Sequence, residues 1–260
     1  MRADSRALVA DPSHAEIETI DGRRVAVRLV VNPRARRISV RICPTRREAI
    51  ATAPTRRHLK RAVDFAAERA GWIASELARL PQGVSLLPGA LAPLRGQMHE
   101  LVYEHGRSPP RIESGERPRI VAPAPDTELF KARLMRFFKA EARADLELRV
   151  AAHGRTLGVK PVKIQVKELR SRWGSCTVEG VLSFSWRVVL APNFVLDYLA
   201  AHEVAHLVHL NHSDKFWTLT RRLFRDTDKA EAWLNAYGAQ LHQYGKPAGY
   251  EAVANQAAGD

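Results

Sequence analysis

Residues 202–206 read His202-Glu203-Val204-Ala205-His206, and a further histidine follows at position 212. In a helix, positions 202 and 206 lie one turn apart on the same face, so two imidazoles can approach one metal ion. Three protein ligands leave a coordination position for water, and Glu203 supplies a carboxylate that can take a proton from that metal-bound water. The stretch therefore predicts a hydrolytic zinc centre in which Glu203 is the catalytic base.

The third ligand is expected among the histidines that follow this pair. His209 shares the helical face, but it lies about 7.5 Å along the axis from the midpoint of positions 202 and 206, which is too far for a zinc–nitrogen bond of about 2.1 Å. Asn211 tolerates the left-handed conformation that ends many helices, and such a turn would bring His212 back toward the ion. We therefore predict a Zn²⁺ site whose ligands are His202, His206 and His212.

Other polar residues near the motif receive supporting roles. His209 is expected beside the ligands or as a cation at the end of the helix, and His242 is the alternative third ligand. Asp197 and Asp214 are the nearest carboxylates in the sequence that could orient a ligand histidine.

The spacing from His202 to His212 equals that of the metzincin pattern, HExxHxxGxxH, but two features exclude that class. His209 stands where the metzincin glycine belongs. All three methionines, Met1, Met98 and Met135, precede the motif, so no methionine turn can follow it.

Three blocks of sequence together resemble the YgjP-like metallopeptidase family, which is related to the WLM and SprT-like zincins. The first block is Arg172-Trp173-Gly174-Ser175-Cys176, and the second is Trp186-Arg187-Val188-Val189-Leu190-Ala191-Pro192. The third runs from His202-Glu203 through Asn211-His212-Ser213 to Phe216-Trp217. Weaker matches, including Trp72-Ile73 and Gly96, extend the resemblance over most of the chain.

The resemblance implies a zinc-dependent peptidase, and it also raises a second function, because the YgjP-like group has been assigned nucleoside triphosphate hydrolysis. It places Arg170, Arg172 and Arg187 near the cleft, where they are candidate substrate-binding residues. Arg172 and Arg187 would bind nucleotide phosphates through paired hydrogen bonds. A polypeptide would instead pair with the main chain of a strand ending at Leu190. A third alternative is a basic, zinc-stabilised binding module, which would not require Glu203.

Composition limits the choice of partners. The 260 residues carry 41 Lys and Arg against 28 Asp and Glu, a formal net charge of +13. This balance makes a polyanionic partner possible, but an aromatic content of 7% offers few surfaces on which bases could stack, so nucleic acid is not favoured. Arg34, Arg36 and Arg37 form a short basic run that fits a solvated strand edge at least as well as a binding patch.

Apolar runs and cysteines indicate the compartment. No apolar run reaches the roughly 20 residues of a membrane helix, and the N-terminus lacks the apolar stretch of a secretory signal. The two cysteines, Cys43 and Cys176, are far apart and in no CxxC pair, so neither a disulfide framework nor a cysteine-ligated zinc site is indicated. We expect a cytoplasmic protein without a membrane partner.

The predicted fold is α+β and zincin-like, with a helical metal-binding lobe that carries a β-hairpin and packs on a β-rich N-terminal lobe. Expected divisions are a tail over 1–13, the β-rich lobe over 14–125, the metallohydrolase lobe over 126–245 and a tail over 246–260. In the first lobe, alternation and turn residues predict strands at 16–20, 23–31, 37–42, 97–103 and 119–121, and a helix over 55–80.

The second lobe is predicted from periodicity and capping residues. A long helix is expected over 127–152, followed by strands at 162–166 and 182–190 that form a hairpin through the turn at Glu179-Gly180. Asn193 is expected to cap the metal helix. Two closing helices are predicted at 213–224 and 228–244.

Overall fold

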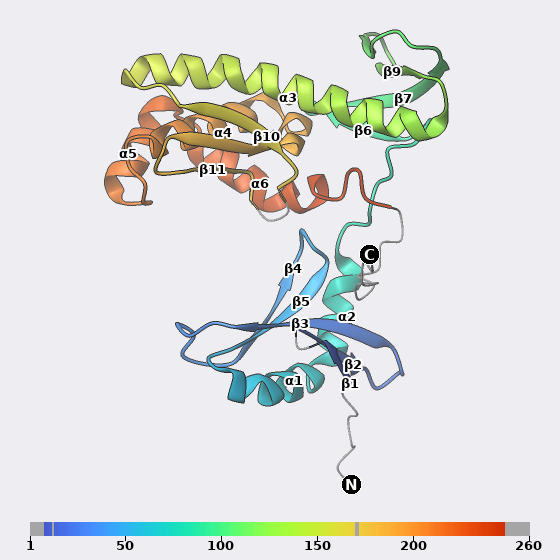
Figure 1. Ribbon diagram of the computed structural model, residues 1–260, viewed down its shortest axis with the longest axis vertical. Coiled ribbons are helices and arrows are strands. Elements are labelled where there is room, and N and C mark those ends of the chain that lie inside the picture. Colours follow the sequence, from blue (N-terminus) through green and yellow to red (C-terminus); the bar gives the residue numbers. More distant parts are fainter. Residues whose placement is uncertain (1–7, 12, 170–171, 248–260) are drawn as a thin grey trace. The chain divides into compact units, whose positions relative to one another are not determined.

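The computed structural model describes residues 8–11, 13–169 and 172–247. It confirms the α+β class, with three separate mixed sheets and a set of helices (Figure 1). The chain forms two compact units, and the division falls between Gln82 and Gly83. The lobe boundary predicted at 125/126 is therefore misplaced, because the strands between 83 and 125 share a core with the metal-binding helices.

Unit 1, the part of the chain up to Gln82, contains a five-stranded sheet. The strands lie in the order β1-β2-β3-β5-β4, with bounds Leu8–Asp11, His14–Glu18, Arg24–Val31, Glu48–Ala53 and Ser39–Cys43. The dipeptide Asp21-Gly22 is typical of a hairpin turn, and it lies between β2 and β3, where Gly22 has a positive φ of 79°. The predicted tail over 1–13 is wrong for residues 8–11, which pair with β2.

The helical part of unit 1 is broken where one helix was predicted. A short 3-10 turn, η1 (Arg56–His58), leads into α1 (Leu59–Ala67), and α2 (Ala70–Arg79) follows after a kink at Arg69, whose φ is −113°. Arg69 donates to the Phe65 carbonyl at 3.1 Å, so its side chain helps to satisfy the end of α1. Both helices pack on the sheet through Val63, Ala66 and Ile73. Strand β5 was missed because its sequence, EAIATA, is rich in alanine, a residue depleted in strands.

Unit 2 begins with a four-stranded sheet in the order β6-β7-β9-β8. Its strands are Leu91–Leu94, Gln97–His105, Arg119–Ala124 and Arg111–Glu113. Helix α3 (Thr127–Leu157) follows, and it begins where the Asp126 carboxylate accepts a hydrogen bond of 2.8 Å from the Leu129 amide. It continues past the predicted end at Ala152 to the left-handed Gly158. In Figure 1 this long helix runs from β9 past α4 and β10.

A second sheet in unit 2 carries the predicted hairpin in altered form. The turn at Glu179-Gly180 joins β11 (Gly174–Cys176) to the antiparallel β12 (Val181–Ser185), while β10 (Lys163–Lys167) lies parallel to β12. The expected strand over 182–190 ends at Ser185, and Trp186–Leu190 form a 3-10 helix, η2. All five η2 residues are buried, Arg187 among them, and a run that is buried throughout does not reveal by periodicity whether it is strand or helix.

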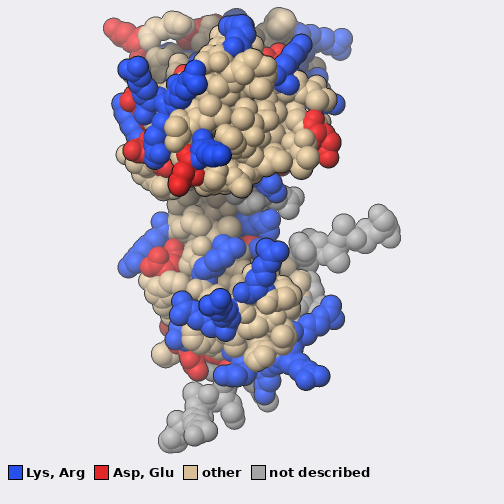
Figure 2. Space-filling view, turned by 90° about the vertical axis from the view of Figure 1, so that its left-hand side faces the viewer, with Lys and Arg blue, Asp and Glu red and all other residues tan. Residues whose placement is uncertain are grey.

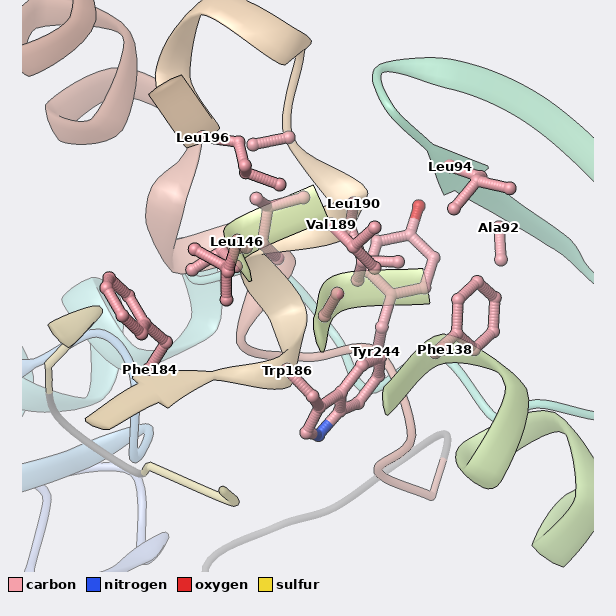
Figure 3. Close-up of a cluster of buried hydrophobic side chains, with 14 of the residues drawn as sticks. Ala92, Leu94, Phe138, Leu146, Phe184, Trp186, Val189, Leu190, Leu196 and Tyr244 are labelled. Atoms are coloured by element: carbon pink, nitrogen blue, oxygen red, sulfur yellow. The ribbon is translucent and has the colours of Figure 1, made fainter. Parts of the chain in front are cut away.

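The core of unit 2 surrounds η2. Phe138 of α3 and Trp186 lie with ring centroids 5.7 Å apart, and Figure 3 shows both rings near Tyr244. The amide of Arg95 donates to the Val189 carbonyl at 2.7 Å, which ties the β6–β7 turn to η2. Helix α4 (Asn193–His206) follows, and α5 (Asp214–Leu223) and α6 (Thr227–Leu241) close the unit. Contacts at Trp186 and at Val189 therefore hold η2, the segment that precedes α4, in place.

Candidate metal centre

Helix α4 is buried on most of its surface and positions the first two histidines. Pro192 precedes it, and Asn193 is its first helical residue and not its cap. The Asn193 carboxamide oxygen instead accepts a hydrogen bond of 3.0 Å from Arg149 of α3. Apolar side chains surround α4, so it cannot rotate without leaving the core, and His202 and His206 are held on one face.

The helix ends at His206, which changes the role expected for His209. Residues 207 and 208 form a turn, so His209 does not continue the helical face. Its backbone carbonyl accepts a hydrogen bond of 2.9 Å from Nδ1 of His206. This contact leaves Nε2 of His206 free to face a ligand, and His209 supports the site through its main chain.

His212 lies where the third ligand was predicted. Its Nε2 atom is 3.2 Å from Nε2 of His202, and nitrogen atoms of His202, His206 and His212 all lie within 4.8 Å of one another. Two nitrogens bound to one tetrahedral zinc at about 2.0–2.1 Å would be about 3.3 Å apart, so these side chains fit the ion. Asn211 is not among the described residues with positive φ, so the turn forms without the expected left-handed residue.

The surroundings of the histidines favour the neutral form that binds metal. Burial, and after it the neighbouring His206 and His212, lower the pKa of His202 to about 3. Burial also lowers the pKa of His206. Phe216 of α5 stacks on the His206 ring at a centroid distance of 4.3 Å, which excludes water from that side. Protons therefore compete weakly with a cation for these two residues.

Tyr198 and Glu231 orient His202, and sequence reasoning missed both. The Tyr198 hydroxyl donates to the Glu231 carboxylate at 2.9 Å and lies 3.3 Å from Nδ1 of His202, from which it can accept. The available signal was the spacing, since Tyr198 precedes His202 by one helical turn. Asp197, a predicted orienting residue, instead contacts His153 at 2.9 Å. Asp214 is the first residue of α5, with no described contact to a ligand histidine.

Glu203 lies next to the histidines in a confined position. Its side chain is 3% exposed, and one carboxylate oxygen has no hydrogen-bond partner among the described residues. A Cβ atom at Gly174 would lie 2.3 Å from the other oxygen, so the glycine of the RWGSC block lets β11 approach the carboxylate. Burial raises the pKa of Glu203 to about 8, and the charge of Arg172 acts in the opposite direction. A buried carboxylate without a partner fits a site completed by a cation.

Comparison with known families gives a match over the part of the chain that contains these histidines. The family model described as the YgjP-like metallopeptidase domain matches residues 36–237. The chain belongs to the YgjP-like metallopeptidase family. The chain is therefore a metal-dependent hydrolase, and its three converging histidines could hold the metal ion.

Two further comparisons add little to the YgjP-like assignment. One solved structure is the metallopeptidase zymogen of Pyrococcus abyssi abylysin, at 17% identity and a TM-score of 0.33, over 36% of this chain and 95% of that one. This similarity is too low to support a conclusion about fold or function. No curated protein matches the chain. No helix of the described residues is long and apolar enough to cross a membrane.

The three arginines predicted near the YgjP-like cleft differ in their surroundings. Arg172 is exposed and close enough to Glu203 to affect its pKa. Arg187 is buried in η2, where it pairs with Glu168 and donates to the Tyr244 carbonyl at 2.8 and 3.1 Å. The expectation that Arg187 binds substrate is therefore wrong, because its guanidinium is fully used inside the core. Arg170 lies outside the described residues.

His242, the alternative third ligand, is also removed from the metal-binding group. Its ring lies 4.3 Å from the Trp173 ring, and it is 3% exposed. The three nitrogens that converge belong to the other histidines. Burial lowers the pKa of His242 to about 4, helped by the charges of Arg187 and Lys246. It is a neutral histidine of the core.

Proposed function

We propose that this metallopeptidase is a zinc enzyme in which His202, His206 and His212 hold the ion and Glu203 is the general base. The observation that carries the proposal is the convergence of three imidazole nitrogens within 4.8 Å beside a carboxylate that is almost fully buried. Three nitrogen ligands leave a position open for chemistry, whereas a structural zinc site closes with four protein ligands.

A bound zinc ion would act as a Lewis acid, polarising the scissile carbonyl and making water easier to deprotonate. Glu203 takes the proton from water and later delivers it to the leaving amine. Its burial keeps bulk water away from the carboxylate, and Gly174 holds the β11 backbone against it. A nearby cation would lower the pKa of Glu203 from its raised value, so the ionised form needed for proton removal would predominate near neutral pH.

Strand β11 supports binding of an extended polypeptide. It is an edge strand of its sheet, because it pairs with β12 alone among the described strands. It contacts α4, and it carries Gly174 against Glu203. A substrate strand paired with the free edge of β11 would place its carbonyl groups near the metal. This role replaces the strand ending at Leu190, since those residues form η2.

Nucleoside triphosphate hydrolysis has less support. It requires paired arginines to bind the phosphates, and Arg187 is bonded to Glu168 and to the Tyr244 carbonyl. Arg172 alone is exposed near Glu203, and a single arginine does not make a clamp for several phosphates. A zinc-stabilised binding module would not need a buried carboxylate at Glu203, so this alternative has less support.

The proposed function can be tested with zinc-loaded protein, the same protein stripped by a chelator, and stripped protein to which zinc is restored. Each is assayed against unfolded casein and against all common nucleoside triphosphates. We expect casein cleavage that disappears with the metal and returns when zinc is restored. Hydrolysis of a nucleoside triphosphate with no cleavage of casein would overturn the peptidase assignment.

A further inference from the structure

A groove in unit 1 lies beside strand β4, within the part of the chain up to Gln82. Two adjoining hollows of about 570 and 530 Å³ share Arg37, Ile38 and Phe65 in their linings. One wall is formed by the start of β4 and the residues before it, and the other by α1 and α2. A strand edge therefore faces helices across an open channel. The metal centre has no part in this groove.

The wall formed by β4 has main-chain groups available for pairing. Strand β4 is last in the sheet order and pairs only with β5 among the described strands. Each outward-facing amide and carbonyl of an edge strand can bond to an added strand. The five residues Ser39–Cys43 give about 17 Å of edge, enough for one short extended segment.

Apolar side chains from both walls form the floor of the groove. Val40 and Phe65 are half-buried along its length. The large indole of Trp72 on α2 lines the same hollow, and Trp72 is 47% exposed. An exposed tryptophan next to half-buried apolar side chains leaves surface that a bound segment would remove from water. Alternate side chains of an added strand would point into this floor.

The rim of the groove is basic. It carries Arg36, Arg37, Arg61 and Arg69, together with the acidic residues Asp64 and Glu68. Glu68 is paired with Arg69 at 3.1 Å, and Arg69 also lies over the Phe65 ring. Positive charge therefore remains in excess. Figure 2 shows Lys and Arg side chains spread over the lower part of the molecule, which is unit 1, with few acidic ones between them.

We propose that this groove binds an extended acidic polypeptide segment, which adds as a strand to the free edge of β4. Apolar side chains of the segment pack on Phe65 and Trp72, and its carboxylates face the arginines of the rim. A strand edge favours a peptide over a single-stranded nucleic acid, which would need several exposed aromatic side chains for stacking. The groove recruits substrate to the enzyme, and this role rests on the proposed peptidase function.

Binding is measured with the full-length Glu203→Gln protein, so that the peptide is not cleaved. The probe is a fluorescein-labelled ten-residue peptide of alternating glutamate and valine, followed by fluorescence anisotropy. We expect Trp72→Ala and Arg37→Glu, each added to Glu203→Gln, to weaken binding at least tenfold. Lys60→Glu is the matched control, because Lys60 is exposed on α1 but lines neither hollow, and it should change binding less than threefold. Thermal unfolding establishes that each variant is folded.

Strand addition is tested with two N-methylated versions of the peptide, one methylated at every valine and one at every glutamate. Amides of alternate residues point to opposite edges of a strand, so only one set can pair with β4. One version should bind at least tenfold more weakly than the other. Equal affinity of the two versions, or equal effects of Trp72→Ala and Lys60→Glu, would overturn the proposal, as would tighter binding of a ten-nucleotide single strand. Because this assay needs no turnover, a chain that binds the peptide but leaves casein intact refutes only the peptidase function.

Discussion

Gly174 and Glu203 show how one missing side chain can define a catalytic position. The carboxylate occupies the space that a Cβ atom on residue 174 would fill, and the β11 backbone cannot retreat without breaking its pairs with β12. We predict that Gly174→Ala retains zinc but lowers peptidase turnover by roughly 10²-fold, because a base displaced by about 1 Å is poorly aligned. Gly71→Ala is the control, since no atom lies within 4 Å of its added Cβ. Unchanged turnover in Gly174→Ala would show that Glu203 is not confined by β11.

The contact between Tyr198 and His202 is expected to strengthen metal binding. The hydroxyl lies between Nδ1 of His202 and the Glu231 carboxylate, so it fixes which ring nitrogen is left for the ion. Tyr198→Phe should weaken zinc affinity by about 10- to 100-fold, as measured by competition with a chromophoric chelator. Tyr237→Phe, at an exposed tyrosine of α6, should bind zinc as wild type does. Equal affinities in the two variants would remove Tyr198 from the support of the site.

His242 makes stability depend on pH. Burial lowers its pKa from 6.5 to about 4. Between these two pH values the residue is protonated in the unfolded chain and neutral in the folded chain. Stability should therefore fall as the pH falls, by about 2 kcal/mol between pH 7 and pH 5 from this residue. Urea unfolding of metal-free protein should show a shallower pH dependence for His242→Gln than for wild type. Identical slopes would mean that His242 is protonated in the folded protein.

Among the elements, the turn after α4 decides which histidine binds metal. Helical geometry correctly placed His202 and His206 on one face and correctly rejected the His209 side chain, but it could not show that the helix ends at His206. At that end, Nδ1 of His206 bonds to the His209 carbonyl, a contact that helical periodicity does not predict. His212 is brought back to the other two histidines without the expected left-handed residue, so the local reason that the sequence suggested for its position is wrong.

Replacement of His212 and replacement of His209 are expected to have opposite effects on the zinc content. His212→Ala should lose most of the bound zinc, because it removes one of three ligands. His209→Ala should retain it, because alanine keeps the backbone carbonyl that His206 uses. Both variants are measured by elemental analysis after purification, relative to one zinc per wild-type chain. Retention of full zinc by His212→Ala, or its loss from His209→Ala, would contradict the ligand assignment.

The type of an element could be predicted where the periodicity was strong, and the prediction failed where every residue of the element is buried. The alternation of β3 and the long apolar stripe of α3 identified both elements. In η2, every residue from Trp186 to Leu190 is buried, so no alternation distinguishes strand from helix. The same burial explains the misassigned Arg187. A sequence shows an arginine beside apolar residues, but it does not show that Glu168 and the Tyr244 carbonyl surround the guanidinium.

At the scale of the whole molecule, the division of the chain was the least predictable feature. The proline-rich residues 123–126 suggested a boundary, yet the β6–β9 sheet packs with α3 and η2 in one core. Long-range contacts such as that of Arg95 with Val189 leave no local signature in the sequence. The metal motif, in contrast, is local, and its residues were found before the lobe that holds them was correctly bounded.

In the proposed peptidase, Glu203 removes the proton from water. Casein hydrolysis is compared between wild-type protein and Glu203→Gln at equal zinc content. Glutamine has nearly the same shape but cannot accept the proton, so the variant should keep its zinc and its fold. We predict that its turnover falls by roughly 10² to 10⁴, the usual contribution of a positioned general base. Turnover equal to that of wild type would contradict the assignment of Glu203 as the base.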